Sequence, residues 1–159
     1  MLRELGSVVV ARAAEWLMRL PQDTRLFMNL HPQELVDASA LCTRMEVLQL
    51  WGNRVVLEIT ERSNVGTDFS WEGALERVKQ MGFQIAVDDL GSGYAALSML
   101  AELQPHYMKV DMSIVRNVDR DDHKLRLVNL LCRFAEATGS EVVAEGVETD
   151  AEAEALAAA

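Results

Sequence analysis

The sequence predicts an α/β fold built on a parallel sheet, and three observations lead to that prediction. Short apolar segments alternate with segments of helical periodicity along the whole chain. The apolar segments are continuous rather than alternating with polar residues, which is typical of strands that helices cover on both faces. The length of 159 residues indicates one domain, residues 1–159, and such a chain can bury roughly two thirds of its unfolded surface in a core.

Helices are expected where apolar residues recur at helical spacing between start and stop signals. The expected ranges, with the residue that stops each, are 2–20 before Pro21, 32–50 before Gly52, 70–82 at Gly82, 95–103 before Pro105 and 125–139 at Gly139. Ser70 can cap the third of these helices. Thr149 and Glu152 have the spacing of a capping box, which predicts a last helix in the alanine-rich tail.

Five strands are expected between these helices. Each consists of apolar residues and has a polar or charged residue at its carboxyl end. The strands cover residues 25–30, 54–60, 83–88, 107–111 and 141–145. The residues at their carboxyl ends are Asn29, Glu58, Asp88 with Asp89, Lys109 with Asp111, and Glu145. Because the carboxyl ends of parallel strands share one face, where ligands bind, we expect these side chains to surround a common site.

The residue types at the strand ends indicate a site for divalent metal ions. Glu58 and Glu145 lie in apolar strands, and a buried carboxylate must be paired, protonated or metal-bound. Hard oxygen ligands without His or Cys favour Mg²⁺ or Mn²⁺ over zinc. The adjacent Asp88 and Asp89 suit two neighbouring ions, which clamp the attacking and leaving oxygens in phosphoryl displacement. The alternative is that each residue only caps or hydrogen-bonds its own loop.

The charge balance narrows the class of ligand. Fifteen Lys and Arg against 25 Asp and Glu give a net charge of −10, which argues against a nucleic-acid polymer or an anionic membrane as partner. A small anionic ligand would need local positive charge from a metal, a helix N-terminus or a placed Lys or Arg. No segment has the ~18 apolar residues of a membrane helix, and the first twenty residues contain no signal-peptide core, so a cytoplasmic protein is expected.

The cysteines and histidines show no metal-ligand spacing. Cys42 and Cys132 lie in apolar helical patterns without a CxxC motif, and we expect them to be buried free thiols. His31, His106 and His123 are expected in loops or at the surface.

A dinucleotide-binding motif is an alternative for part of the same region. Gly91, Gly93 and Ala96 fit the pattern G-x-G-x-x-A after a strand, and Asp111 ends the next strand. Two carboxylates stand directly before the first glycine, however, where they would meet a pyrophosphate. This interpretation also leaves the acidic residues of the other strands unexplained.

Five motifs occur in a consistent order over about residues 1–150. They are NLHP at 29–32, EITE at 58–61, DDLGSGY at 88–94, MKVDMSIV at 108–115 and AEGVE at 144–148. With these motifs the sequence resembles the EAL family of bacterial cyclic di-GMP phosphodiesterases. DDLGSGY and AEGVE are highly specific, whereas NLHP is weak alone and has His31 where serine is more usual.

The resemblance implies an incomplete (β/α)-barrel of the TIM-like type, with one strand running against the others. It implies Asn29, Glu58, Asp88 and Glu145 as metal ligands, with Asp89 on a second ion. Lys109 would orient or deprotonate the attacking water, and Glu145 would share the catalytic role. The residues implied to support the loop and the substrate are Glu61, Gly91, Ser92, Gly93, Tyr94, Asp111 and Glu148. Of these, Glu61 would tie down the DDLGSGY loop, which couples metal binding to dimer contacts in the family.

The sequence also departs from the family pattern. The N-terminal segment with the E-A-L signature and the arginine that follows it is missing, as is the segment after AEGVE with its glutamine and final strand. A complete barrel of this type takes ~250 residues, so we expect residues 1–159 to be a single EAL-like fragment that lacks one metal ligand. Glu4 and Glu15 are the carboxylates of the first helix that could replace it.

The resulting hypothesis is metal-dependent hydrolysis of cyclic di-GMP to linear pGpG with two Mg²⁺ or Mn²⁺ ions. The first alternative is a catalytically inactive cyclic-di-GMP-binding or regulatory module, and the more remote one is a nicotinamide-dinucleotide-binding domain. We expect the chain as given to turn over substrate weakly or not at all. Missing strands leave a sheet edge open, which favours a homodimer or larger assembly, and a fused sensor or GGDEF domain is expected in the full protein.

Overall fold

The computed structural model describes residues 2–60, 72–91 and 96–159, which form two compact units. The first unit contains residues 2–59 and 72–85, and the second contains residue 60 together with residues 86–91 and 96–159. Strands alternate with helices in both units, and the strand pairs within each unit are parallel. The α/β class predicted from the sequence is therefore confirmed. The reversed strand implied by the resemblance is not among these described pairings.

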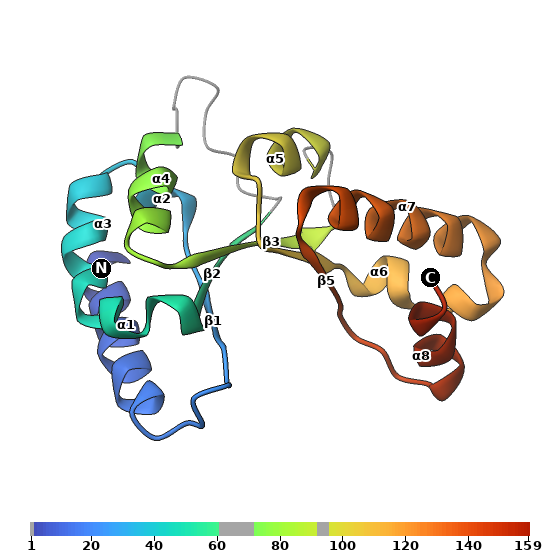
Figure 1. The fold of residues 1–159 in the computed structure, drawn as a ribbon, viewed down its shortest axis with the longest axis horizontal. Helices are drawn as coiled ribbons and strands as arrows, with labels where there is room; N and C mark the ends of the chain where they lie inside the picture. Colours follow the sequence, from blue (N-terminus) through green and yellow to red (C-terminus); the bar gives the residue numbers. More distant parts are fainter. Residues whose placement is uncertain (1, 61–71, 92–95) are drawn as a thin grey trace. The chain divides into compact units, whose positions relative to one another are not determined.

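The first unit carries two strands and most of the N-terminal helices (Figure 1). Its elements are α1 (Leu2–Leu17), β1 (Leu26–Asn29), α2 (Pro32–Leu35), α3 (Ala38–Met45), the 3-10 helix η1 (Glu46–Arg54), β2 (Val55–Thr60) and α4 (Glu72–Gln80). β2 is buried from Val55 to Ile59, as its continuous apolar sequence predicts. α1 buries Val10, Ala13 and Leu17, which share one helical face and place the helix against the core.

The single helix expected over residues 32–50 is wrong, because the structure divides this segment into α2, α3 and η1. The break falls at Asp37, whose side chain accepts a hydrogen bond from the N–H of Ala40 at 3.0 Å and so caps α3. His31 caps α2 in the same way, since its Nδ1 accepts from the N–H of Gln33 at 3.2 Å. Side chains that bond to nearby backbone compete with a continuous helix.

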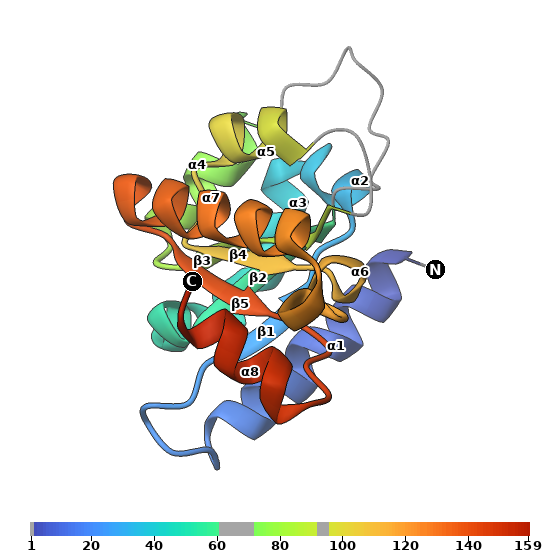
Figure 2. The same cartoon turned by 90° about the vertical axis from the view of Figure 1, so that its right-hand side faces the viewer.

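The second unit contains the remaining strands and the C-terminal helices. Its elements are most of β3 (Gln84–Leu90), then α5 (Ala96–Leu103), β4 (Tyr107–Val110), α6 (Met112–Val115), the 3-10 helix η2 (Val118–Arg120), α7 (Asp122–Thr138), β5 (Glu141–Ala144) and α8 (Asp150–Ala157). β4 pairs with both β3 and β5. α7 contacts both β5 and α8, as can be followed in Figure 2. The small core beneath α7 consists of Val110, Ile114, Val115, Val118 and Val128.

The helix ends of the second unit follow from capping side chains. α7 begins at Asp122, earlier than expected, because Asp121 accepts hydrogen bonds from the N–H groups of His123 at 2.9 Å and Lys124 at 3.2 Å. Both hydrogen bonds favour the charged carboxylate and keep the pKa of Asp121 below its ordinary value of 3.8, and the bond from Lys124 contributes most. α7 ends at Gly139 as expected. The capping box predicted for the last helix is present as well.

The two thiols differ in exposure. Cys42 is buried, as expected, but the expectation of a buried Cys132 is wrong, because its side chain is partly exposed. Partial burial, together with the charge of Glu136, raises the pKa of Cys132. No helix among the described residues is both long and apolar enough to cross a membrane.

Candidate metal centre

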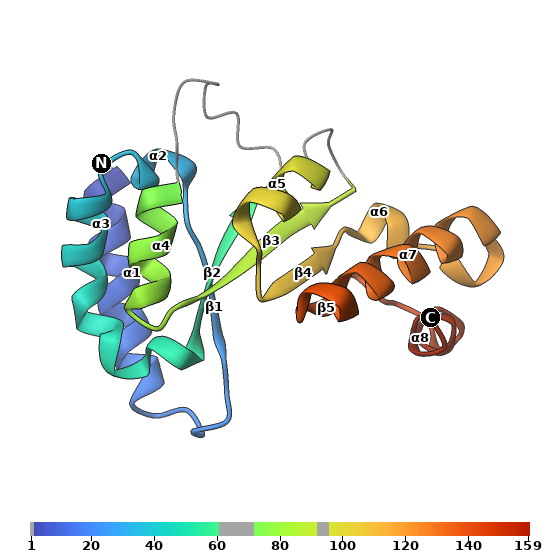
Figure 3. The same ribbon diagram turned by 45° about the horizontal axis from the view of Figure 1, so that its top comes forward.

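Three carboxylates of the second unit form a cluster. Oxygen atoms of Asp88, Asp89 and Glu145 lie within 4.8 Å of one another. The two aspartates belong to β3, Glu145 follows β5, and β4 lies between these strands (Figure 3). Asp88 is buried and the other two are partly exposed. The structure thus brings together three of the residues that the sequence analysis placed at strand ends.

A distortion of β3 allows two consecutive aspartates to reach this cluster. Neighbouring residues of a regular strand point to opposite faces of the sheet. Here the register between β3 and β4 shifts between Val87 and Leu90, where the two aspartates lie. Asp89 adopts a left-handed backbone with φ of 59°. An irregularity of this kind turns a side chain toward a new direction, and strained backbone of this sort is typical of functional sites.

Lys109 of β4 supplies the positive charge of the cluster. Its Nζ lies 2.9 Å from Oδ1 of Asp88 and 2.8 Å from Oε1 of Glu145, and the residue is only 9% exposed. Three carboxylates and one ammonium leave a net negative charge that a divalent cation would neutralise. Carboxylate oxygens are also the donors that Mg²⁺ and Mn²⁺ prefer, so the residues present fit such an ion.

Asn29 and Glu58 form a separate pair in the first unit. The two residues lie opposite each other in the parallel register of β1 and β2, and the N–H of Leu30 donates to the carbonyl oxygen of Glu58 at 2.8 Å. Glu58 is 6% exposed, which is rare for a carboxylate, whereas Asn29 is exposed. The convergence of this pair with the acidic cluster stays a prediction.

Four of the residues expected to support the loop and the substrate, Glu61, Ser92, Gly93 and Tyr94, lie outside the described residues. The other three are placed. Gly91 has a φ of 99° next to Ile114, Asp111 caps α6 by accepting from the N–H of Ser113 at 2.8 Å, and Glu148 forms an ion pair with Arg116.

The carboxylates considered as replacements for the missing ligand belong to the first unit. Glu4 and Glu15 belong to α1 in the first unit, where Glu15 pairs with Arg12 at 2.8 Å. The letters E-A-L also occur at residues 154–156, but these residues lie in α8, where Glu154 is exposed. A glutamate on a surface helix differs in its setting from a ligand at the end of a strand.

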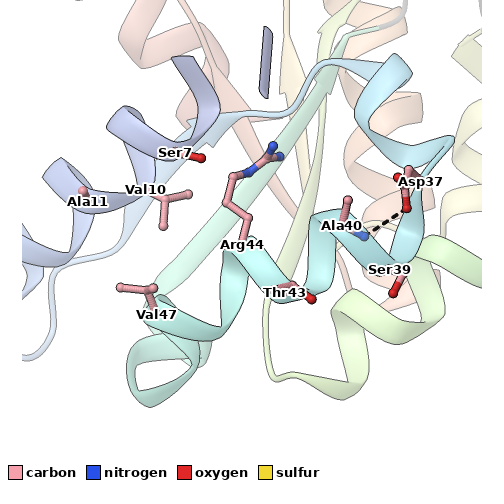
Figure 4. Close-up of a pocket in the computed structure, with 9 residues that line it drawn as sticks. All are labelled: Ser7, Val10, Ala11, Asp37, Ser39, Ala40, Thr43, Arg44 and Val47. Atoms are coloured by element: carbon pink, nitrogen blue, oxygen red, sulfur yellow. Dashed lines mark hydrogen bonds between the residues drawn. The ribbon is translucent and has the colours of Figure 1, made fainter. Parts of the chain in front are cut away.

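The first unit also contains a groove of about 680 Å³ between α1 and α3 (Figure 4). Ser7, Asp37 and Arg44 are among the residues that line it. Asp37 caps α3, and Arg44 is ion-paired with Glu34, so both charged groups already have partners within the unit. The charged residues that line the groove are thus one carboxylate, Asp37, and one guanidinium, Arg44, rather than a cluster of carboxylates.

Comparisons with known proteins agree with the motifs. The model of the EAL domain family matches residues 1–159. The probable cyclic di-GMP phosphodiesterase PdeG of Escherichia coli K12 is 38% identical over 134 residues, which cover 82% of this chain and 26% of that protein. The cyclic di-GMP phosphodiesterase RocR of Pseudomonas aeruginosa is 31% identical over 138 residues, which cover 84% of this chain and 35% of that protein. The chain thus spans only about a quarter to a third of these curated relatives.

Solved structures show the same fold. BlrP1 of Klebsiella pneumoniae, in a complex with manganese and cyclic di-GMP, has a TM-score of 0.85 and 31% identity, over 98% of this chain and 41% of that one. The EAL domain of Mycobacterium smegmatis DcpA has a TM-score of 0.83 and 30% identity, over 96% of this chain and 70% of that one. These likenesses confirm a fold of the TIM-like barrel type, of which the described residues supply five strands.

Proposed function

This chain belongs to the EAL family, and from that premise we propose that residues 1–159 are part of one EAL domain that hydrolyses cyclic di-GMP to linear pGpG. The observation that carries the proposal is the cluster of Asp88, Asp89 and Glu145 around the buried Lys109. The names of PdeG and RocR, and the nucleotide in the BlrP1 complex, support the choice of substrate.

The metal ligands in this proposal are the residues of the cluster together with the pair of the first unit. They are Asn29, Glu58, Asp88, Asp89 and Glu145. The manganese of the BlrP1 complex supports Mg²⁺ or Mn²⁺ as the cofactor. Divalent ions at this site would supply an activated water and neutralise the charge of the phosphodiester, which an acidic protein would otherwise repel.

Lys109 has two roles in the proposed reaction. Its ammonium neutralises part of the charge of Asp88 and Glu145 through the contacts at 2.9 and 2.8 Å. As an ammonium it also orients the attacking water, and its charge stabilises the negative charge that develops on the phosphate, whereas in its neutral amine form it would instead take the proton of that water. Glu145 accepts from Nζ of Lys109 and so fixes the direction of that group.

A binding or regulatory module without turnover is the second candidate, because the same acidic cluster could hold cyclic di-GMP through a metal ion without hydrolysing it. Titration of the purified chain with cyclic di-GMP and with NAD, each with and without Mn²⁺, separates the candidates. Metal-dependent binding with even slow formation of pGpG supports the phosphodiesterase, because this chain is expected to turn over substrate weakly. Metal-dependent binding with no detectable product after long incubation supports the module, and binding of NAD alone would contradict both.

Substitutions test the assigned roles. Asp88→Asn should weaken Mn²⁺ binding because an anionic ligand becomes neutral, whereas Asp122→Asn, at the exposed start of α7, should not. Lys109→Ala should keep Mn²⁺ binding and remove turnover, with a loss of roughly 10²–10⁴-fold for a group that acts on the water. Equal Mn²⁺ affinity of the Asp88→Asn variant and the wild type would refute the metal site.

The two edge strands of the sheet support the proposal that this chain assembles with further chain segments. β1 pairs with β2 and β5 pairs with β4, and neither edge strand has a second partner among the described residues. Open edges recruit further strands, so completion of the barrel by other chain segments and formation of a homodimer are part of the proposal. A fused sensor or GGDEF domain in the full protein is likewise proposed, since the match covers only 26% of PdeG and 35% of RocR.

A further inference from the structure

The carboxylate of Glu152 joins two chain segments, one of which begins at Glu145 of the acidic cluster. Glu152 belongs to the first turn of α8 and is only 3% exposed. Its Oε2 accepts from the N–H groups of Glu148 at 2.9 Å and Thr149 at 3.2 Å. Its Oε1 accepts from the N–H of Asn117, 35 residues away, at 2.8 Å. One buried side chain thus satisfies three backbone donors from two loops.

The first of these loops begins at a residue of the cluster, and the second follows the short helix that comes after Lys109. The loop of residues 145–149 begins with Glu145, whose N–H donates to the carbonyl oxygen of Val110 at 3.1 Å. Asn117 follows α6, the helix that comes directly after β4 and its Lys109. Glu152 therefore ties the segment that leaves Glu145 to the segment that leaves Lys109, and these two residues are themselves in contact at 2.8 Å.

Further contacts bring the same two segments together. A Cβ atom on Gly146 would lie 2.8 Å from Cβ of Met112, so the loop packs closely on α6. Arg116 forms an ion pair with Glu148, but the side chain of Glu148 is 69% exposed, and such a pair stabilises little. The buried tie through Glu152 is the stronger of the two, because hydrogen bonds to a charged group in a shielded site are strong.

We propose, on the basis of the phosphodiesterase function above, that Glu152 is a positioning residue that holds Glu145 in place for Lys109 and the metal ion. It acts through the backbone of residues 145–149 and touches neither the ion nor the substrate. Groups that orient metal ligands commonly contribute 10- to 100-fold to metal affinity. The proposal therefore predicts a loss of that order in Mn²⁺ affinity when the tie is removed.

The test uses the 159-residue chain with three substitutions. Glu152→Ala removes all three acceptor contacts. Glu152→Gln keeps one acceptor oxygen but turns an amide NH₂ toward a backbone donor, so an intermediate effect is expected. Asp121→Ala is the matched control, because Asp121 also caps a helix of the second unit with its carboxylate but does not bond to residues 145–149 in the described structure. Mn²⁺ affinity is measured by calorimetry where circular dichroism shows each variant folded.

The expected result is roughly 10- to 100-fold weaker Mn²⁺ binding in Glu152→Ala and near wild-type binding in Asp121→Ala. The rate of amide hydrogen exchange provides a second measurement, which does not depend on the metal. Loss of the tie should speed exchange at the N–H of Glu145 as well as at Glu148, Thr149 and Asn117, whereas a merely local capping role would change only the last three.

Unchanged Glu145 exchange together with unchanged Mn²⁺ affinity would overturn the proposal. Absence of Mn²⁺ binding in the wild type would instead overturn the proposed function, and the Glu145 exchange then decides the role of Glu152. If Glu152→Ala does not fold, Glu152→Gln is read in the same way.

Discussion

The ammonium group of Lys109 lies between the carboxylates of Asp88 and Glu145, at 2.9 and 2.8 Å from their nearest oxygens. Three neighbouring strand segments thereby meet at one cation. Burying an ammonium is costly unless anionic partners offset the lost hydration, and these two carboxylates do so. The reverse also holds, since the lysine offsets the mutual repulsion of carboxylates that lie within 4.8 Å of one another.

Lys109→Met should therefore destabilise the metal-free protein. The isosteric substitution keeps the packing of the side chain but leaves the carboxylates without their counter-charge. We expect the free energy of unfolding to fall by about 1–3 kcal/mol, less than for a fully buried pair because the side chain of Glu145 is 36% exposed. Urea denaturation in EDTA measures this change, and saturating Mn²⁺ should recover much of it. Arg126→Met on the exposed face of α7 is the control, and an equal loss in both variants would contradict the prediction.

Asp89→Gly should raise stability and lower metal affinity at the same time. A residue other than glycine with a φ of 59° is strained, so glycine at this position should increase the free energy of unfolding by about 0.5–1 kcal/mol. The same change removes one carboxylate from the cluster. Asp89→Asn keeps the side chain without its charge, so it should lose Mn²⁺ affinity but gain less stability than Asp89→Gly, because it relieves the repulsion between carboxylates and not the backbone strain. Urea denaturation and Mn²⁺ titration of both variants make the comparison, and a Gly variant less stable than the wild type in EDTA would show that the backbone is not strained.

The strands and most helices of this fold could be predicted from the sequence because their signals are local. Continuous apolar segments mark the buried strands, and the capping box of Thr149 and Glu152 lies within four residues. The break at Asp37 was missed because the apolar periodicity continues across a capping side chain. The short helix α6 was missed for a similar reason, since Asp111 extends an apolar strand in the sequence but caps a helix in the structure.

The acidic cluster could be predicted in composition but not in geometry. The order of residues indicates that Asp88 and Glu145 end parallel strands, and this is sufficient to bring them near each other. A regular strand would send Asp89 to the opposite face, so its presence in the cluster depends on the register shift in β3. The contact of Glu152 with Asn117 joins residues 35 positions apart, and no local sequence pattern predicts it.

Two glycine substitutions should separate backbone strain from steric overlap. Gly91 and Gly139 both have left-handed backbone, with φ of 99° and 73°. A Cβ on Gly139 would meet nothing within 4 Å, so Gly139→Ala should cost only the conformational penalty of about 1–2 kcal/mol. A Cβ on Gly91 would lie 2.1 Å from Cδ1 of the buried Ile114, which should add about 1–3 kcal/mol of overpacking. Thermal and urea denaturation of the two variants give the difference, and equal losses would mean that Ile114 moves aside without cost.

The acid stability of the protein should depend on Glu152. The N–H groups of Glu148, Asn117 and Thr149 donate to its carboxylate and favour the charged form, so the pKa of Glu152 lies below its ordinary value of 4.5 in spite of burial. A depressed pKa in the folded state means that the carboxylate stabilises the fold above pH 4.5, where it is charged in both states. This contribution is lost as the pH falls below 4.5 and through the folded-state pKa, because the unfolded chain then takes up the proton first.

Glu152→Gln has no such proton to take up. The difference in unfolding free energy between wild type and Glu152→Gln, measured by urea denaturation, should therefore be constant at neutral pH and shrink on acidification below 4.5. A difference that stays the same down to the acid limit of folding would show that the three backbone donors do not favour the charged carboxylate.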